Sequence, residues 1–127
     1  MTTKEKERAL QWLAFHRRHP IVFRTYCRLL IEEIRAGRQN FGIAAVTERM
    51  RWDPMVLKRI GKASLNDHFD PYWSRLFAAT YPHHRGALEY RASGADEINY
   101  NAILLGDDEK AIGHDEQFEF NFEEGAA

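Results

Sequence analysis

The sequence predicts a mainly α-helical domain of four or more helices with an acidic C-terminal extension. Three observations support this. Apolar residues recur at helical spacing in several segments before residue 92. Proline and glycine separate these segments. The charge also reverses along the chain: residues 1–91 hold 17 Lys and Arg against 9 Asp and Glu, a formal +8, whereas residues 92–127 hold one Lys against 10 acidic residues, a formal −9. We therefore expect a basic helical domain over 1–91 and an acidic extension over 92–127.

The first two predicted helices meet at a proline. Thr2 or Thr3 can cap a helix that runs to about Arg17. Pro20 suits the first turn of a second helix and disfavours helical backbone at the residue before it. The second helix has the clearest pattern and ends near Gly37, a natural C-terminal cap. Its apolar face holds Phe23, Tyr26, Cys27, Leu30, Ile31 and Ile34.

A third helix is expected over residues 41–52, with Asn40 as a candidate cap and Asp53-Pro54 as its end. Residues 55–65 are ambiguous, because their apolar residues fit either a short strand or an irregular hairpin. This segment is the main uncertainty in the predicted topology.

A fourth helix is expected over residues 66–80. Asn66 or Asp67 can cap it, and Tyr81-Pro82 ends it. Residues 83–91 fit a turn plus a strand, or a helical turn. The apolar stripe of the fourth helix is Phe69, Trp73, Leu76, Phe77 and Thr80.

This order of helices, with minor β structure between or after them, matches a helix-turn-helix or winged-helix layout. The fourth helix would then read bases through exposed side chains. The predicted base-reading candidates are Asn66, His68, Tyr72, Ser74 and Arg75. The predicted phosphate-binding residues are Arg38, Arg49, Arg51, Lys58, Arg59 and Lys62.

The connection over residues 53–65 is too long for a tight turn, so this layout would need an insertion there. A small all-α bundle produces the same apolar pattern and stays open as an alternative. The basic face would then be a solvated surface, partly paired with the acidic extension. Among the tryptophans, Trp52 is the better candidate for exposure and for stacking on a nucleobase, although the sequence favours a core position for it.

Four segments resemble a family of small, mostly uncharacterised phage and prophage proteins. They read FHRRHPIVF, IRAGRQNFGIAAVTERMRWD, LNDHFDPYWSRLFAATYP and EYR, and ERMRW and YWSRLF are the most specific parts. The resemblance covers about three fifths of the chain and stops at Arg91. It implies a phage-linked protein and brings no established activity, so it assigns no catalytic residues.

The sequence holds no pattern typical of an enzyme or a metal site. No Gly-rich phosphate loop, GxSxG or HExxH motif occurs. The six histidines lack zinc-site spacing, and Cys27 lies on the apolar face of the second helix, where a thiol is buried and unreactive. We therefore predict a protein that is not an enzyme and that holds no cofactor and no metal.

Composition also bears on the location of the protein. A single cysteine fits a reducing compartment. The charged start MTTKEKERALQW lacks the apolar core of a signal peptide, and no apolar run has membrane-spanning length. We expect a cytoplasmic protein of a bacterial host cell that does not contact the membrane.

The C-terminal extension ends in an alternating pattern, QFEFNFEE. Gln117, Phe118, Phe120 and Phe122 loosely match the peptides with which bacterial replication proteins bind the sliding clamp. The same alternation fits a terminal strand that packs on the body. We expect residues 92–127 to be mobile and to compete with DNA for the basic domain, so that their deletion strengthens DNA affinity.

Two function classes follow from the sequence. The first is a phage-encoded, non-enzymatic accessory protein that binds DNA through the basic domain. The alternative is a protein-interaction module that binds and modulates a host protein through the acidic aromatic tail, with the sliding clamp as one candidate partner. The sequence leaves open whether the protein forms a homodimer.

Overall fold

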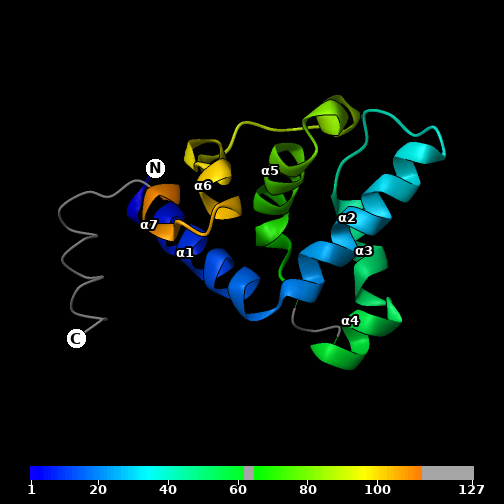
Figure 1. Cartoon of the computed structure of the whole chain (residues 1–127), viewed down its shortest axis with the longest axis horizontal. Helices are drawn as coiled ribbons and strands as arrows, with labels where there is room; N and C mark the ends of the chain where they lie inside the picture. Colours follow the sequence, from blue (N-terminus) through cyan, green and yellow to red (C-terminus); the bar gives the residue numbers. More distant parts are fainter. Residues whose placement is uncertain (62–64, 113–127) are drawn as a thin grey trace.

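Two long helices form the frame of the molecule and meet at the predicted proline (Figure 1). In the computed structural model, which describes residues 1–61 and 65–112, α1 spans Thr3–Arg18 and α2 spans Pro20–Arg35. The Thr2 hydroxyl accepts a hydrogen bond from the Glu5 amide at 3.1 Å, and the Glu5 carboxylate accepts one from the Thr2 amide at 2.8 Å. This capping box fixes the start of α1. Gly37, with φ of 93°, follows the end of α2 as predicted.

The central helix α5, Asp70–Thr80, lies between α1 and α2 (Figure 1). Its Trp73 ring meets the Trp12 ring edge-on at 5.5 Å and stacks on Tyr26 at 5.2 Å. Aromatic rings bury large apolar areas, so this cluster joins the three helices at the centre of the core. Four residues of the predicted stripe, Phe69, Trp73, Leu76 and Phe77, are buried, and the fifth, Thr80, is half-buried. A short 3₁₀ helix, η2 (Asp67–Phe69), precedes α5.

The segment after α2 forms two short helices, α3 (Ala44–Arg51) and α4 (Pro54–Arg59). α3 begins later than predicted, and Asn40 is a left-handed turn residue with φ of 53° rather than a cap. The strand considered for residues 55–65 is wrong for the part described. The Asp53 side chain accepts hydrogen bonds from the first backbone amides of α4, which sets a helix in this segment.

β structure is limited to one bridge in the described ranges. After the 3₁₀ helix η3, Pro82–Ala87, the chain returns beside the segment before α3. The Phe41 amide donates to the Ala87 carbonyl at 3.2 Å, and the Glu89 amide donates to the Phe41 carbonyl at 2.9 Å. Residues 1–61 and 65–112 hold no strand, so the minor β structure expected from the sequence is reduced to this contact. The bridge also keeps Phe41 outside α3.

The first part of the acidic extension is packed into the core. η4 (Gly94–Glu97), α6 (Tyr100–Leu104) and α7 (Asp108–Ala111) lie beside α1 and α5 (Figure 1). The expected mobility is therefore wrong for residues 94–112. The buried side chains in this region are Ala95, Ile98, Tyr100, Ala102, Ile103, Ala111 and Ile112.

Acidic and polar residues of this region have local structural roles. Ser93, Asn99 and Asp107 each accept a hydrogen bond from a backbone amide at the start of a short helix. Asp108 pairs with Arg17 of α1 at 2.5 Å. Part of the negative charge of the extension thus compensates the basic body within the fold. Across residues 1–61 and 65–112, no helix combines the length and the apolar character that a membrane span requires.

Candidate functional site

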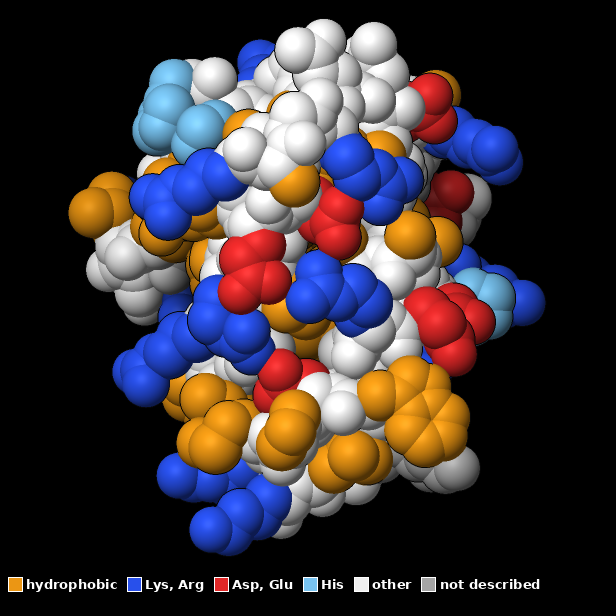
Figure 2. Space-filling model, turned by 90° about the vertical axis from the view of Figure 1, so that its right-hand side faces the viewer, with side chains coloured by type: hydrophobic (Ala, Val, Ile, Leu, Met, Phe, Trp, Pro, Cys, Tyr) orange, Lys and Arg blue, Asp and Glu red, His pale blue; other side chains and the backbone are white. Residues whose placement is uncertain are grey.

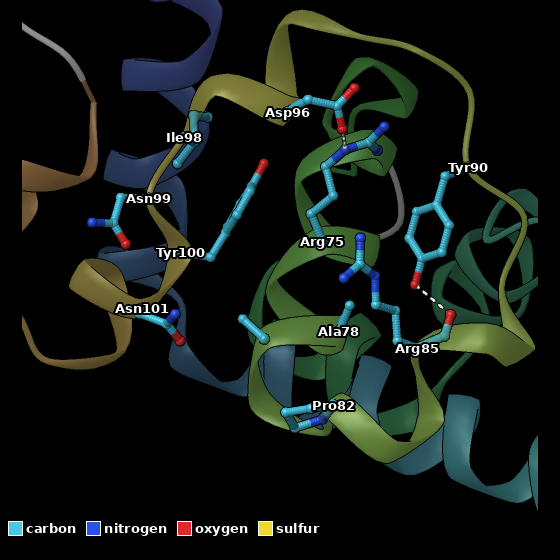
Figure 3. A pocket seen from close by; sticks show the side chains of 11 residues that line it. Arg75, Ala78, Pro82, Arg85, Tyr90, Asp96, Ile98, Asn99, Tyr100 and Asn101 are labelled. Carbon is cyan, nitrogen blue, oxygen red and sulfur yellow. Dashed lines mark hydrogen bonds and ion pairs between the residues drawn. The ribbon is translucent and has the colours of Figure 1, made fainter.

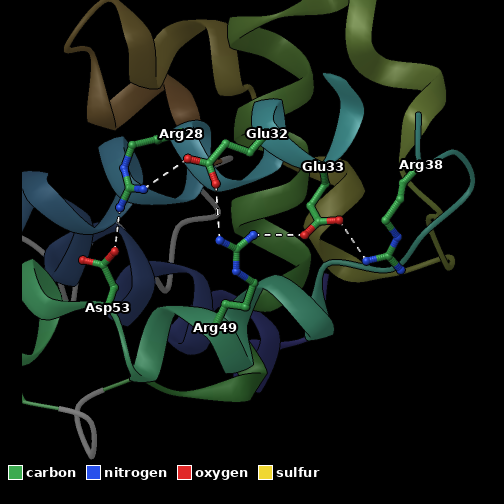
Figure 4. Close-up of polar contacts among 6 residues, drawn as sticks. All are labelled: Arg28, Glu32, Glu33, Arg38, Arg49 and Asp53. Atoms are coloured by element: carbon green, nitrogen blue, oxygen red, sulfur yellow. Dashed lines mark hydrogen bonds and ion pairs between the residues drawn. The ribbon is translucent and has the colours of Figure 1, made fainter. Parts of the chain in front are cut away.

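Three of the predicted phosphate-binding arginines are engaged in ion pairs. Arg38 and Arg49 belong to a ladder of alternating charges that crosses α2 and α3 (Figure 4). Arg49 bridges Glu32 at 3.3 Å and Glu33 at 3.0 Å, and Glu33 also accepts from Arg38 at 3.1 Å. The hydrogen bond from Arg38 is the main reason why the pKa of Glu33 is lowered.

The ladder continues toward α4. Glu32 pairs with Arg28 at 3.4 Å, and Arg28 pairs with Asp53 at 2.5 Å (Figure 4). Three arginines and three carboxylates alternate, so the ladder carries no net charge. Binding a phosphate there would require breaking pairs that already exist, which weakens the prediction that Arg38 and Arg49 hold phosphates.

Arg51 forms a separate cluster. Its guanidinium donates to Glu48 at 2.6 Å, to the Asp67 carboxylate, and to the Leu65 carbonyl at 3.4 Å. The hydrogen bond to Asp67 is the first cause of the raised pKa of Arg51. The Arg51 side chain connects α3 to the segment before α5, and its charge is already paired with two carboxylates.

The base-reading prediction for the helix expected over residues 66–80 is wrong for three of its five residues, which lie in α5. Tyr72, Ser74 and Arg75 are buried at 4%, 2% and 9% exposure, respectively. Their positions lie toward α1, η4 and α6 because α5 runs through the centre of the domain and is covered on several sides. A central helix cannot enter a DNA groove.

Besides the paired Arg38 and Arg49, four predicted site residues are exposed. Asn66 caps η2, since its side-chain oxygen accepts from the His68 amide at 2.9 Å, and the His68 ring is exposed. Lys58 and Arg59, in the last turn of α4, form no ion pair with a described residue. The remaining predicted residues, Lys62, Gln117, Phe118, Phe120 and Phe122, lie outside the described ranges.

Exposed apolar side chains gather where α3 passes into α4. Trp52 is 62% exposed, Met55 44% and Leu57 38%. We call these three residues the α4 apolar surface. Figure 2 shows orange side chains collected at the lower end of this face, below the alternating red and blue side chains. The core position that the sequence favours for Trp52 is wrong, and the sequence did not indicate the exposure of Met55 and Leu57. The exposure of Met55 and Leu57 follows from the shortness of α4: a helix of six residues buries only one narrow face, here that of Val56.

A buried polar chain joins α2, α3 and α5. The Tyr26 and Thr47 hydroxyls lie 2.7 Å apart, and the Thr47 hydroxyl donates to Asp70 at 2.7 Å. Burial raises the pKa of the Asp70 carboxyl to about 6, and the nearby Asp67 adds to this. Burial also raises the pKa of Tyr26. The chain satisfies polar groups that the core would otherwise leave unpaired.

The Cys27 thiol lies in the core, and the His16 imidazole packs against it. Cys27 is buried, and burial raises the pKa of its thiol to about 12, which keeps it in the unreactive form. His16 stacks on Trp12 at 5.8 Å, and burial lowers its pKa to about 4. Among the described residues, no group of three or more His, Cys, Asp and Glu side chains is arranged to hold a metal ion.

Comparison with known proteins gives no match: no protein-family model, no curated protein and no solved structure corresponds to this chain. The assignment of a function therefore depends on the surfaces described above.

Proposed function

We propose that the chain is a phage-encoded, non-enzymatic accessory protein of the bacterial cytoplasm that binds a host protein through the α4 apolar surface. The observation that carries this proposal is the exposure of Trp52, Met55 and Leu57 within six consecutive residues. Contiguous exposed apolar side chains favour a protein contact, and tryptophan is prominent among the residues that dominate binding energy.

The surroundings of the surface suggest the chemistry of the partner. Lys58 and Arg59 extend from the same short helix and form no ion pair with a described residue. Behind them, the neutral ladder joins α4 to α2 through Asp53 and Arg28. A rigid apolar centre with a basic edge fits an apolar partner surface that carries carboxylates at its rim.

Nucleic-acid binding is the second candidate, and one observation favours it. The exposed Trp52 lies a few residues from Lys58 and Arg59, so a base could stack on the indole while the two cations bind phosphates. A helix-turn-helix arrangement would then have to read through α4, because α5 is buried. α4 has only six residues, which gives few side chains for base recognition.

A capture experiment from nuclease-treated host lysate separates the two candidates. The full chain, its Trp52→Ser variant and its Leu105→Ser variant serve as baits. Leu105 is 86% exposed beyond the end of α6 and is the matched control. The proposal predicts a stoichiometric protein that the full chain and Leu105→Ser retain and that Trp52→Ser loses.

The nucleic-acid candidate makes a different prediction. Duplex DNA should bind the full chain at about 50 mM salt and weaken about tenfold by about 200 mM, the loss expected when two cations bind phosphates. The double variant Lys58→Gln/Arg59→Gln should flatten the dependence of log affinity on log salt by about two. Strong DNA binding with this dependence, and no protein captured, would replace the first proposal with the second.

A further inference from the structure

A pocket of about 510 Å³ opens between α5, η3 and the segment from η4 to α6, separate from the α4 apolar surface (Figure 3). Pockets of this volume hold small organic molecules. Residues far apart in the sequence form it, since α5 supplies Arg75 and Ala78, η3 supplies Pro82 and Arg85, and the chain beyond residue 89 supplies the opposite wall.

One of the two arginines in the wall is fully committed to the fold. Arg75 Nε donates to Asp96 at 2.6 Å, and its two terminal nitrogens donate to the backbone carbonyls of Pro71 at 3.0 Å and Arg91 at 2.6 Å. Its guanidinium also lies over the Tyr90 ring, 5.6 Å from the centroid. Asp96 balances the charge of Arg75, and these bonds hold the wall in place.

The second arginine has a different role. The Arg85 guanidinium extends toward Arg75 and Tyr90 (Figure 3), and it forms no hydrogen bond or ion pair with a described residue. Its backbone carbonyl accepts a hydrogen bond from the Tyr90 hydroxyl at 2.9 Å, which fixes the ring beside it. Two guanidinium groups and one carboxylate therefore line the pocket, a net charge of +1 in a partly enclosed space.

The rest of the wall suits the body of an organic ligand. Ala78, Pro82 and Ile98 give apolar surface, and the exposed Asn101 offers a side-chain amide near the mouth. We infer that this pocket binds a small organic anion, a carboxylate or a phosphate monoester with a compact apolar body. In this assignment Arg85 pairs with the charged group, and the apolar wall receives the body.

The experiment is an NMR titration of the ¹⁵N-labelled full chain with phenyl phosphate and with benzoate, and benzyl alcohol is the neutral probe. The expected result is saturable shifts at residues 78–101 for at least one anion, with benzyl alcohol at least about tenfold weaker, since a charge-assisted contact contributes about that factor. Arg85→Gln should weaken the anion at least about tenfold. Ala78→Leu narrows the pocket without changing its charge and should weaken the anion and the alcohol alike.

Arg24→Gln is the matched control, because Arg24 is an exposed arginine of α2 outside the pocket. It should bind each probe within twofold of the unchanged chain. Three results would overturn the assignment: no saturable shift with either anion, equal binding of benzyl alcohol, or an Arg85→Gln affinity that matches Arg24→Gln. Intact spectra of each variant show that the fold is retained.

Discussion

Arg28 and Asp53 connect α2 to the start of α4 through an ion pair of 2.5 Å. The other carboxylate oxygen of Asp53 accepts from the amides of Met55 at 3.0 Å and Val56 at 3.3 Å. One side chain thus begins α4 and also ties it to the frame of the molecule. The exposed Trp52 and Met55 on either side of Asp53 therefore project from a fixed base.

The cap and the ion pair of Asp53 can be separated by substitution. Asp53→Ala removes both and should lower the free energy of unfolding by about 1–2 kcal/mol, the usual effect of losing an N-cap. Asp53→Asn keeps a capping oxygen and loses only the charge of the pair, and Arg28→Gln removes the pair from the side of the exposed partner. The Arg28 side chain is 52% exposed and that of Asp53 9%, so each variant should cost about 1 kcal/mol. Urea unfolding measures all three. Equal losses for Asp53→Ala and Asp53→Asn would show that the cap contributes nothing.

Asp70 and His16 predict opposing pH dependences of stability. Between its ordinary pKa of 3.8 and its folded pKa of about 6, Asp70 binds a proton more tightly in the folded state, so stability falls as pH rises. The His16 pKa is lowered from 6.5 to about 4, so over that window the unfolded state binds the proton more tightly and stability rises with pH.

Single variants reveal the two contributions. Relative to the unchanged chain, Asp70→Asn should become more stable as pH rises from 4 to 6, because it lacks the falling contribution. His16→Phe should become less stable over pH 4 to 6.5, because it lacks the rising one. Denaturant unfolding at several pH values gives both differences, in which the contributions of groups distant from the substituted residue cancel. Parallel curves for either variant would contradict the assigned pKa shift.

The packing of residues 94–112 predicts where the chain can be shortened. A chain ending at residue 91 lacks the buried Tyr100, whose ring meets Trp12 edge-on at 6.0 Å, and Ile103. It should fail to unfold cooperatively, because a central tryptophan loses its cover. A chain ending at residue 112 keeps every described contact and should unfold cooperatively. Circular dichroism melts compare the two.

The packing of residues 94–112 also determines how competition between the acidic extension and DNA has to be tested. Deleting residues 92–127 would damage the core, so any effect on DNA affinity has to be measured with the chain that ends at residue 112. If that chain binds duplex DNA more tightly than the full chain at equal salt, residues 113–127 act as the competitor.

Substitutions of the two partners in the Arg75–Asp96 ion pair should lower the free energy of unfolding by different amounts. Arg75→Leu breaks bonds to Asp96 and to the Pro71 and Arg91 carbonyls, and should cost about 2–4 kcal/mol, because the buried guanidinium makes three charge-assisted hydrogen bonds that a leucine cannot replace. Asp96 is 54% exposed, so Asp96→Asn should cost about 1 kcal/mol. Thermal melts distinguish them. Equal and small losses would mean that Arg75 does not fasten residues 91–96 to α5.

Much of the helical frame could be predicted from local signals. Pro20 and Gly37 mark the ends of α2 because their backbone preferences act within a few residues. The stripe on α5 was equally clear. Helical periodicity does not indicate which other faces of α5 are covered, so the sequence predicts exposure for Tyr72, Ser74 and Arg75, which are buried.

The candidate site was harder to predict, because the pairing of its charged side chains depends on residues that are distant in the sequence. Arg49 looks like a phosphate ligand in sequence, and only the approach of α2 places Glu32 and Glu33 beside it. The prediction that the acidic extension is mobile is wrong for residues 94–112 for a similar reason. The charge of the extension indicated a solvated tail, whereas Asn99 and Asp107 cap short helices that bury apolar neighbours.

The most direct test of the proposed function is hydrogen–deuterium exchange of the full chain with and without the captured host protein. Binding through the α4 apolar surface predicts slower exchange at residues 52–61 on complex formation and unchanged exchange at residues 104–106 beyond α6. Protection confined to other segments, or none at saturating partner, would contradict the assignment of the α4 apolar surface as the contact site.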